Sequence, residues 1–324
     1  MYTYKELIEI VQQYFAAEHF TGTPAHLYEP IDYTLSQGGK RIRPVLLLAA
    51  ADMLGADLEE ARYAAIGLET FHNFTLLHDD LMDQSPMRRG KPTVYRKWDE
   101  NTAVLSGDAM NILAWRYFLR KPHPQLLAIL RTFEQTSMEI CEGQQYDMDF
   151  EQRTDVRLDE YMEMIRLKTA VLLGCALKIG ALYANAGPDD TQHLYQFGIN
   201  LGLAFQLRDD LLDTYGDPAT FGKETGTDIR DNKKTFLLLS ALEKADPSRC
   251  QRLLALCSTR PEAAEAKVKE VTEIYNSLGI KEITEQKITC LHQEALQHLQ
   301  ACSVPDERKK TLQNIAQTLL NRNA

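Results

Sequence analysis

Two acidic clusters with the same spacing are the residues of this chain best suited to chemistry. They are Asp79-Asp80-Leu81-Met82-Asp83 and Asp209-Asp210-Leu211-Leu212-Asp213. Both lie within apolar stretches, where carboxylates are uncommon unless a positive charge compensates them. In a helix, the first and last aspartate of each cluster share one face. Two such faces meeting across a cavity would bind hard divalent cations, so the pattern indicates magnesium and a diphosphate substrate.

A simpler explanation exists for either cluster alone, because acidic helix surfaces often carry this spacing and remain solvated. Two copies flanked by leucine and phenylalanine favour a functional site over that explanation. Each cluster is expected at the C-terminal end of a helix, from about residue 58 to 83 and from about 191 to 215. Carboxylates there oppose the helix dipole, and a bound cation would compensate them.

Basic clusters supply the opposite charge. Lys40, Arg41 and Arg43 follow Gly38-Gly39, just before an apolar helix expected to begin near Pro44. A proline at the first helical position and the surrounding backbone N–H groups suit an anion, and the planar donors of arginine match phosphate oxygens. An ordinary basic turn is the alternative.

Further cations lie near expected helix ends. Arg88 and Arg89 follow the first acidic cluster by a few residues, and Lys168, Lys223 and Lys233 occur later in the chain. Together with the acidic clusters they predict a cavity that binds anions and metal. The charged, glycine-rich stretch from Thr214 to Asp228 is interpreted as a lid over this cavity, or else as a surface connection.

Helical periodicity runs through nearly the whole sequence, which predicts an all-α fold of roughly ten helices. The chain has 324 residues and no linker-like tract, so we expect a single domain over residues 1–324. The net charge of −10 argues against binding to nucleic acid. Six scattered cysteines without a CxxC pair, no signal peptide and no membrane-spanning stretch predict a cytoplasmic protein without stable membrane insertion.

At this point the sequence resembles the trans-isoprenyl diphosphate synthases, a polyprenyl synthetase family, over nearly its whole length. The resemblance rests on an ordered set of motifs: Gly39-Lys40-Arg41-Ile42-Arg43-Pro44, His78-Asp79-Asp80-Leu81-Met82-Asp83, Arg88-Arg89-Gly90, Lys168-Thr169, Phe205-Gln206-Leu207-Arg208-Asp209-Asp210-Leu211-Leu212-Asp213, and Lys223 with Lys233. It implies an all-α helical bundle around a deep central cavity, which works as a homodimer with three magnesium ions. The implied reaction joins isopentenyl diphosphate to an allylic diphosphate (dimethylallyl, geranyl or farnesyl).

The resemblance also implies a role for individual residues. Asp79 and Asp83 would bind two of the metal ions and Asp209 the third, while Asp80, Asp210 and Asp213 would support them directly or through water. The allylic diphosphate would be held by Arg88, Lys168, Lys223 and Lys233. Isopentenyl diphosphate would be held by Lys40, Arg43, His72 and Arg89. Thr169 and Gln206 would line the developing allylic cation, and the released diphosphate would take the final proton.

Product length is expected to depend on the residues one to three turns before Asp79. Geranylgeranyl diphosphate synthases of the family often have an aromatic residue five positions before this aspartate, which Phe74 matches. The second aromatic residue or longer acidic motif common in farnesyl diphosphate synthases is lacking, since Thr75 occupies the neighbouring position.

Helix geometry alone does not single out Phe74. On an ideal helix, Phe74 lies about 140° around from Asp79 and Thr75 only about 40°. Phe71 could equally form the cavity floor, and ordinary core packing would explain both rings. Geranylgeranyl diphosphate is the expected product, with farnesyl diphosphate as the alternative.

Other functions remain open at this stage. A terpene cyclase shares the first acidic motif but normally has a different second metal motif and does not need the Lys40 and Arg43 pair. A metal-dependent phosphohydrolase would use His72 and the His78-Asp79 pair, yet leaves the second motif unexplained. A non-catalytic subunit of a heteromeric synthase would typically have a damaged acidic motif, whereas both are intact here.

Overall fold

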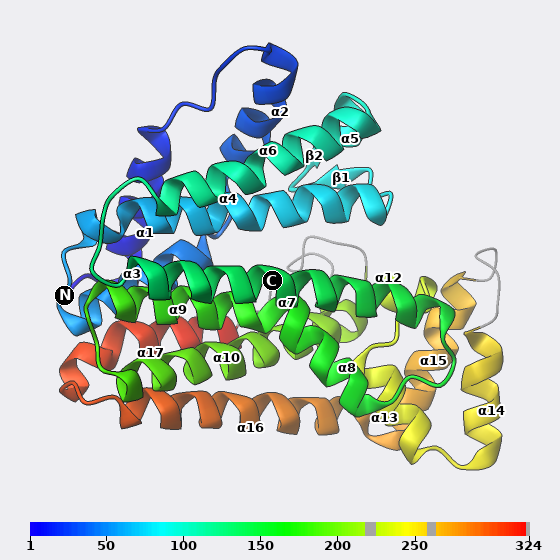
Figure 1. Cartoon of the computed structure of the whole chain (residues 1–324). Helices are drawn as coiled ribbons and strands as arrows, with labels where there is room; N and C mark the ends of the chain where they lie inside the picture. Colours follow the sequence, from blue (N-terminus) through cyan, green and yellow to red (C-terminus); the bar gives the residue numbers. More distant parts are fainter. Residues whose placement is uncertain (218–224, 258–263, 322–324) are drawn as a thin grey trace. The chain divides into compact units, whose positions relative to one another are not determined.

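The computed structural model describes residues 1–217, 225–257 and 264–321 (Figure 1). This part of the chain is almost entirely helical, and the all-α class is confirmed. It contains more helices than the ten expected, because several short helices lie between the long ones. None of the helices in the described ranges is long and apolar enough to cross a bilayer.

The chain divides into two compact units. The first contains residues 1–132, 176–192 and 303–312, and the second contains residues 133–175, 193–302 and 313–324. The division falls within four helices: α7 (Leu126–Gln152), α9 (Val171–Tyr183), α10 (Pro188–Tyr215) and α17 (Asp306–Leu320). A single domain over residues 1–324 therefore stays a prediction.

The first unit is formed by the N-terminal helices and one hairpin. Its elements are α1 (Tyr4–Ala16), α2 (Ala25–Ser36), α3 (Ile42–Leu54), α4 (Leu58–Met82), β1 (Met87–Arg88), β2 (Lys91–Pro92), α5 (Val94–Lys97) and α6 (Glu100–Phe118). Asp57 caps α4 by accepting a hydrogen bond from the Glu59 N–H at 3.0 Å. Helix α4 packs on α3 and α6. A Cβ at Gly67 would lie 2.9 Å from the carbonyl oxygen of Ala114, so this glycine permits the close approach of α4 and α6.

The second unit contains the remaining elements. They are α8 (Leu158–Ile165), the π-helix η1 (Arg166–Ala170), α12 (Thr227–Arg230), α13 (Phe236–Lys244), α14 (Pro247–Leu256), α15 (Ala264–Leu278) and α16 (Ile280–Ala301). Helix α10 passes very close to its neighbours. A Cβ at Gly198 would lie 2.6 Å from Gly174 of α9, and one at Gly202 would lie 2.5 Å from Ala170 of η1.

Two local expectations need correction. Helix α3 begins at Ile42, two residues before Pro44. The preceding residue, Arg41, has a left-handed conformation (φ 47°) and occupies the N-cap position of the helix. Helix α10 begins at Pro188 and not near residue 191, with the proline at a position that suits the first turn. Residues 87–92 form an antiparallel hairpin, in which Arg88 pairs with Lys91.

Candidate active site

The first acidic motif ends helix α4, and its three aspartates have different surroundings. Asp80 points inward, is buried, and accepts hydrogen bonds from Arg88 Nε at 2.8 Å and Nη2 at 2.7 Å. Burial raises the pKa of Asp80, and the Arg88 guanidinium opposes that rise. Asp79 is half-buried, with Arg88 Nη2 at 3.7 Å, and Asp83 is exposed at the helix end. The two partly accessible carboxylates are therefore those one helical turn apart.

The β1–β2 hairpin brings the neighbouring arginines to this motif. Its two loop residues, Arg89 and Gly90, both have positive φ (50° and 73°), as a tight hairpin of this kind requires. Arg88 thereby reaches Asp80, while Arg89 donates to the Gly38 carbonyl at 2.5 Å. A Cβ at Gly39, where φ is 124°, would lie 2.9 Å from the Arg89 guanidinium, so only glycine suits this position.

A group of arginines surrounds His72 on α4. Arg43 Nη1 lies 2.9 Å from His72 Nε2, which acts as the acceptor because a guanidinium can only donate. Burial and the charges of Arg43, Arg89, Arg88 and Arg41 hold the pKa of His72 well below its ordinary value, so the ring is neutral. The Nε of Arg43 is buried and has no hydrogen-bond partner among the described residues. This N–H is a donor suited to an anion.

The other two basic residues of the Gly38–Pro44 segment differ from Arg43. Arg41 was expected to join the anion-binding cations, but it is buried and forms an ion pair with Glu69 at 3.1 Å. It also lies over the Phe15 ring, with Cζ 4.3 Å from the ring centroid. Arg41 is thus part of the internal packing, because Glu69 compensates its charge. Lys40 is exposed immediately before it.

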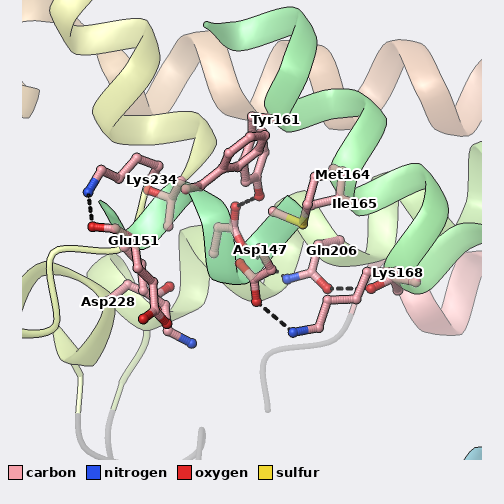
Figure 2. A pocket seen from close by; sticks show the side chains of 14 residues that line it. Asp147, Glu151, Tyr161, Met164, Ile165, Lys168, Gln206, Asp228 and Lys234 are labelled. Carbon is pink, nitrogen blue, oxygen red and sulfur yellow. Dashed lines mark hydrogen bonds and ion pairs between the residues drawn. The ribbon is translucent and has the colours of Figure 1, made fainter. Parts of the chain in front are cut away.

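The second unit contains a cavity of about 130 Å³. Figure 2 shows the side chains that line it. Five of the expected site residues lie here: Lys168, Thr169, Gln206, Asp210 and Lys233. Several lining residues had no assigned role, namely Asp147, Glu151, Tyr161, Asp228 and Lys234.

Polar side chains in this cavity form a continuous hydrogen-bonded chain. The Thr169 hydroxyl donates to Gln206 Oε1 at 3.1 Å, and Gln206 Nε2 donates to Asp210 Oδ1 at 3.1 Å. The Tyr161 hydroxyl donates to Asp210 Oδ2. Burial raises the pKa of Asp210 to about 6, while these donors and the Phe236 backbone N–H oppose the rise. Asp210 therefore supports its neighbours from the interior.

Lys168 and Thr169 lie in the π-helix η1, an element that is often found at functional sites. Lys168 Nζ contacts Asp147 Oδ2 of α7 at 2.6 Å (Figure 2). A Cβ at Gly143 of α7 would lie 2.4 Å from the backbone nitrogen of Lys168, so this glycine lets α7 pass directly beside η1. The local helix geometry and one glycine thus place Lys168 and Thr169 at the cavity.

The other two aspartates of the second motif differ in how far they are exposed to solvent. Asp209 is half-buried, whereas Asp213 is buried and accepts hydrogen bonds from the Thr227 hydroxyl and, at 3.0 Å, from the Asp228 N–H. Burial and repulsion from Asp210 and Asp213 raise the pKa of Asp228 to about 8. Asp213 therefore anchors the end of the stretch expected to form a lid. Lys223, within that stretch, lies outside the described residues.

Lys233 follows directly from this anchored segment. Its backbone N–H donates to the Asp228 carbonyl at 2.9 Å. Lys267 of α15, only 3% exposed, donates to the Arg230 carbonyl at 3.2 Å and to Asn232 Oδ1 at 2.5 Å. Sequence reasoning did not identify Lys267, because nothing in the pattern of α15 distinguishes a buried lysine from a solvated one.

The residues expected to control product length lie on α4. Phe71 is buried, and its ring centroid is 5.5 Å from that of the half-buried Phe74. Phe74 in turn contacts the His78 ring edge-on at 4.8 Å. His78 Nε2 lies 3.1 Å from the Val104 carbonyl oxygen, and the ring fits against Gly107 of α6, where a Cβ would be 2.2 Å away. Thr75 donates its hydroxyl to the His72 carbonyl at 2.8 Å.

The expected site residues thus form two groups, one in each unit. The meeting of the two acidic motifs across one cavity stays a prediction. Among the described residues, no group of three or more His, Cys, Asp or Glu side chains is arranged to hold a metal ion. Magnesium that is completed by water and substrate phosphates needs fewer protein carboxylates than that.

Comparison with known proteins identifies the family. The polyprenyl synthetase family model matches residues 24–275. A geranylgeranyl diphosphate synthase of Methanosarcina mazei is 41% identical over 224 residues, 68% of this chain and 69% of that protein. A geranylfarnesyl diphosphate synthase of Aeropyrum pernix is 34% identical over 300 residues, 90% of this chain and 93% of that protein. A crystal structure of a geranylgeranyl pyrophosphate synthase matches with a TM-score of 0.95 and 44% identity, covering 100% of both chains. The family expected from the motifs is therefore confirmed: this chain belongs to the polyprenyl synthetases.

Proposed function

We propose that the protein is a short-chain trans-isoprenyl diphosphate synthase. It joins isopentenyl diphosphate head-to-tail (1'-4) to an allylic diphosphate and releases diphosphate. The observation that carries this proposal is the cavity in which Lys168, Thr169, Gln206 and Asp210 lie together, since it combines cations for a leaving diphosphate with oxygen dipoles for the allylic cation. Prenyl transfer is also the activity named for the relatives of the family.

The proposal includes magnesium, with three ions when substrate is bound. Asp79 and Asp83 would hold two ions and Asp209 the third. The donor set fits, because these carboxylates offer hard oxygen ligands that are exposed or half-buried. The buried Asp80, Asp210 and Asp213 are engaged by other groups and would support the ligands. Bound magnesium would neutralise the charge that develops on the departing diphosphate.

The cations form two sets, and each set suits one of the two substrates. Arg88, Lys168, Lys223 and Lys233 would bind the allylic diphosphate. Lys40, Arg43, His72 and Arg89 would bind isopentenyl diphosphate without metal. Arg43 supports this assignment because its buried Nε lacks a partner among the described residues, and the neutral His72 ring beside it does not neutralise its charge.

The residues then act by binding, orienting and shielding. Fixed cations stabilise the leaving diphosphate, so the carbon–oxygen bond of the allylic substrate ionises. The oxygens of Thr169 and Gln206 face the resulting cation in a cavity that excludes water. The double bond of isopentenyl diphosphate attacks this cation, and loss of a proton gives a longer allylic diphosphate. The released diphosphate is the proposed acceptor of that proton.

Geranylgeranyl diphosphate is the proposed product, with farnesyl diphosphate as the alternative. The half-buried Phe74, its contacts with Phe71 and His78, and the names of several relatives support this length. Relatives named geranylfarnesyl diphosphate synthase at 34–38% identity show that longer products occur among similar proteins.

We also propose a homodimer in the cytoplasm. Leu105, Ile112 and Leu119 recur every seven residues along α6 and at its end, and are 61%, 62% and 58% exposed. This spacing places them on one face, which a second copy of the chain would cover. The absence of disulfides among the six cysteines supports a reducing compartment. Sedimentation of the wild-type chain and of Ile112→Glu tests the dimer, since the charge is expected to produce monomers.

One assay tests the function. The purified chain is incubated with isopentenyl diphosphate, each allylic primer in turn and magnesium, and the products are analysed by mass spectrometry. We expect a longer prenyl diphosphate whose formation stops with a chelator. A hydrocarbon product would indicate a terpene cyclase, phosphate release without prenyl transfer would indicate a phosphohydrolase, and an inactive pure chain would indicate a partner subunit. Full turnover with chelator would overturn the proposal.

A further inference from the structure

Tyr161 of α8 lies in the cavity of the second unit but has no part in the reaction described above. Its side chain is buried, and its hydroxyl donates a hydrogen bond to Asp210 (Figure 2). Asp210 lies on α10, 49 residues later in the chain. The ring of Tyr161 therefore connects α8 to the second acidic motif at a point where the motif faces inward.

The hydrogen bonds around Asp210 fix the orientation of Gln206. Two donors converge on the Asp210 carboxylate, namely the Tyr161 hydroxyl and the Gln206 amide. A carboxylate in this position can only accept, so Gln206 must direct its NH₂ group toward Asp210. Its carbonyl oxygen then faces the Thr169 hydroxyl, at 3.1 Å.

This orientation determines the polarity of Thr169. A hydroxyl has one hydrogen and two lone pairs. Since Thr169 donates its hydrogen to Gln206 Oε1, its lone pairs are left for whatever occupies the cavity. A lone pair stabilises a developing carbocation, whereas a hydroxyl hydrogen directed at it would destabilise it.

We propose that Tyr161 is a positioning residue for prenyl transfer. Tyr161 holds Asp210, and Asp210 fixes the orientation of the Gln206 amide. The Gln206 carbonyl oxygen then holds the hydroxyl hydrogen of Thr169, so that the Thr169 lone pairs are directed at the allylic cation. This inference rests on the proposed function. It assigns the buried middle aspartate of the second motif to orienting dipoles, separately from metal binding.

The test is a double-mutant cycle between Tyr161→Phe and Thr169→Val, read as the single-turnover rate of condensation at saturating magnesium. Tyr161→Phe keeps the ring and removes only the donor. We expect it to slow the single-turnover rate by about tenfold, as the loss of one transition-state hydrogen bond would. The KM for both diphosphates is expected to stay within about twofold, because no diphosphate contact is removed.

The coupling between the two sites separates positioning from mere packing. If Tyr161 acts through Gln206 and Thr169, adding Tyr161→Phe to Thr169→Val slows the reaction by less than about twofold. Independent effects that multiply in the double variant would overturn the inference. Tyr275→Phe, in a fully buried tyrosine outside the cavity lining, is the matched control and should leave the rate unchanged.

A second variant tests the same inference from the other end. Asp210→Asn keeps the shape of the side chain, but its amide can donate to Gln206 and so allow Gln206 to turn over. We expect a slower single turnover with the magnesium concentration for half-maximal rate within about twofold of wild type. An increase of tenfold or more in that concentration would instead make Asp210 part of the metal site and overturn the inference.

Failure of this inference can be told apart from failure of the proposed function. An inactive wild-type chain would refute the proposed function. An active wild-type chain in which Tyr161→Phe and Thr169→Val have independent effects on the rate would refute only the role of Tyr161.

Discussion

The two acidic motifs have the same sequence pattern, but the charge of the buried middle aspartate is compensated by different groups in each. On α4, Asp80 is compensated by a full positive charge, the guanidinium of Arg88. On α10, Asp210 is compensated by neutral donors, including Tyr161 and Gln206. The difference shows that a carboxylate can be kept inside either by a counter-charge or by converging dipoles. In the second case it can also orient the groups that hold it.

The last aspartates of the two motifs differ as well. Asp83 is exposed at the end of α4, while Asp213 is buried and holds Thr227 and Asp228. The first motif therefore presents two partly accessible carboxylates, and the second presents Asp209. Helical spacing predicts which residues share a face, but the surroundings decide which of them are available to a metal.

The largest expected effect separates accessible from buried aspartates. Asp79→Asn and Asp209→Asn should each lower kcat by at least about 1,000-fold, because loss of a metal ligand removes several kcal/mol of transition-state stabilisation. Asp213→Asn should lower it by only about tenfold, since its role is to anchor the Thr227 segment. Rates measured over a magnesium series would check this. Equal losses for all three variants would remove the distinction between accessible and buried positions.

The next largest effect concerns the stability of each motif. Asp80→Asn should destabilise the fold by about 2–3 kcal/mol, less than for a fully buried pair because the Arg88 side chain is 32% exposed. Asp210→Asn should cost less, since it also removes a buried charge that only dipoles compensate. Urea unfolding measures both. In an Arg88→Met background the Asp80→Asn penalty should largely disappear, and its persistence would argue against the ion pair as the cause.

A smaller effect is the pH dependence of stability without metal. The folded state raises the pKa of Asp210 to about 6 and of Asp228 to about 8, from an ordinary value of 3.8. Between about pH 4 and pH 8 the folded state thus binds more protons than the unfolded state, and the free energy of unfolding should fall as pH rises. Asp228→Asn should flatten this decline in the presence of a chelator. The exposed Asp159→Asn is the control, and an unchanged slope in Asp228→Asn would contradict the assignment.

The smallest effect on rate is expected at Phe74, where the product itself should change. Phe74→Ala removes a ring that contacts Phe71 and His78, so the cavity should deepen and the product lengthen. Condensation rates should stay within about threefold, because no diphosphate contact is touched. Phe71→Ala is the comparison variant. If mass analysis of the Phe74→Ala products shows an unchanged distribution, Phe74 has no part in length control.

Much of this architecture could be predicted from the sequence, because α4 and α10 are long and periodic. The placement of Asp79 and Asp83 on one face follows from their spacing alone. In contrast, Arg41 and Arg43 look equivalent in sequence, but Arg41 is turned inward by Glu69, 28 residues away, and by the Leu35 carbonyl. The same holds for Tyr161, whose partner Asp210 is distant in the chain, and for Lys267. Long-range partners of this kind leave no local pattern.

The π-helix η1 has a consequence for how tolerant this region is to changes in length. A wider turn contains one residue more than the α-helical path it replaces, so α8 and α9 are out of phase by one position on either side of it. Removing one residue of Arg166–Ala170 other than Lys168 or Thr169 would restore a regular helix and rotate α8 by about 100° relative to α9. Tyr161 would then turn away from Asp210, although every residue named in the cavity would still be present. In this stretch the count of residues is therefore as constrained as their identity.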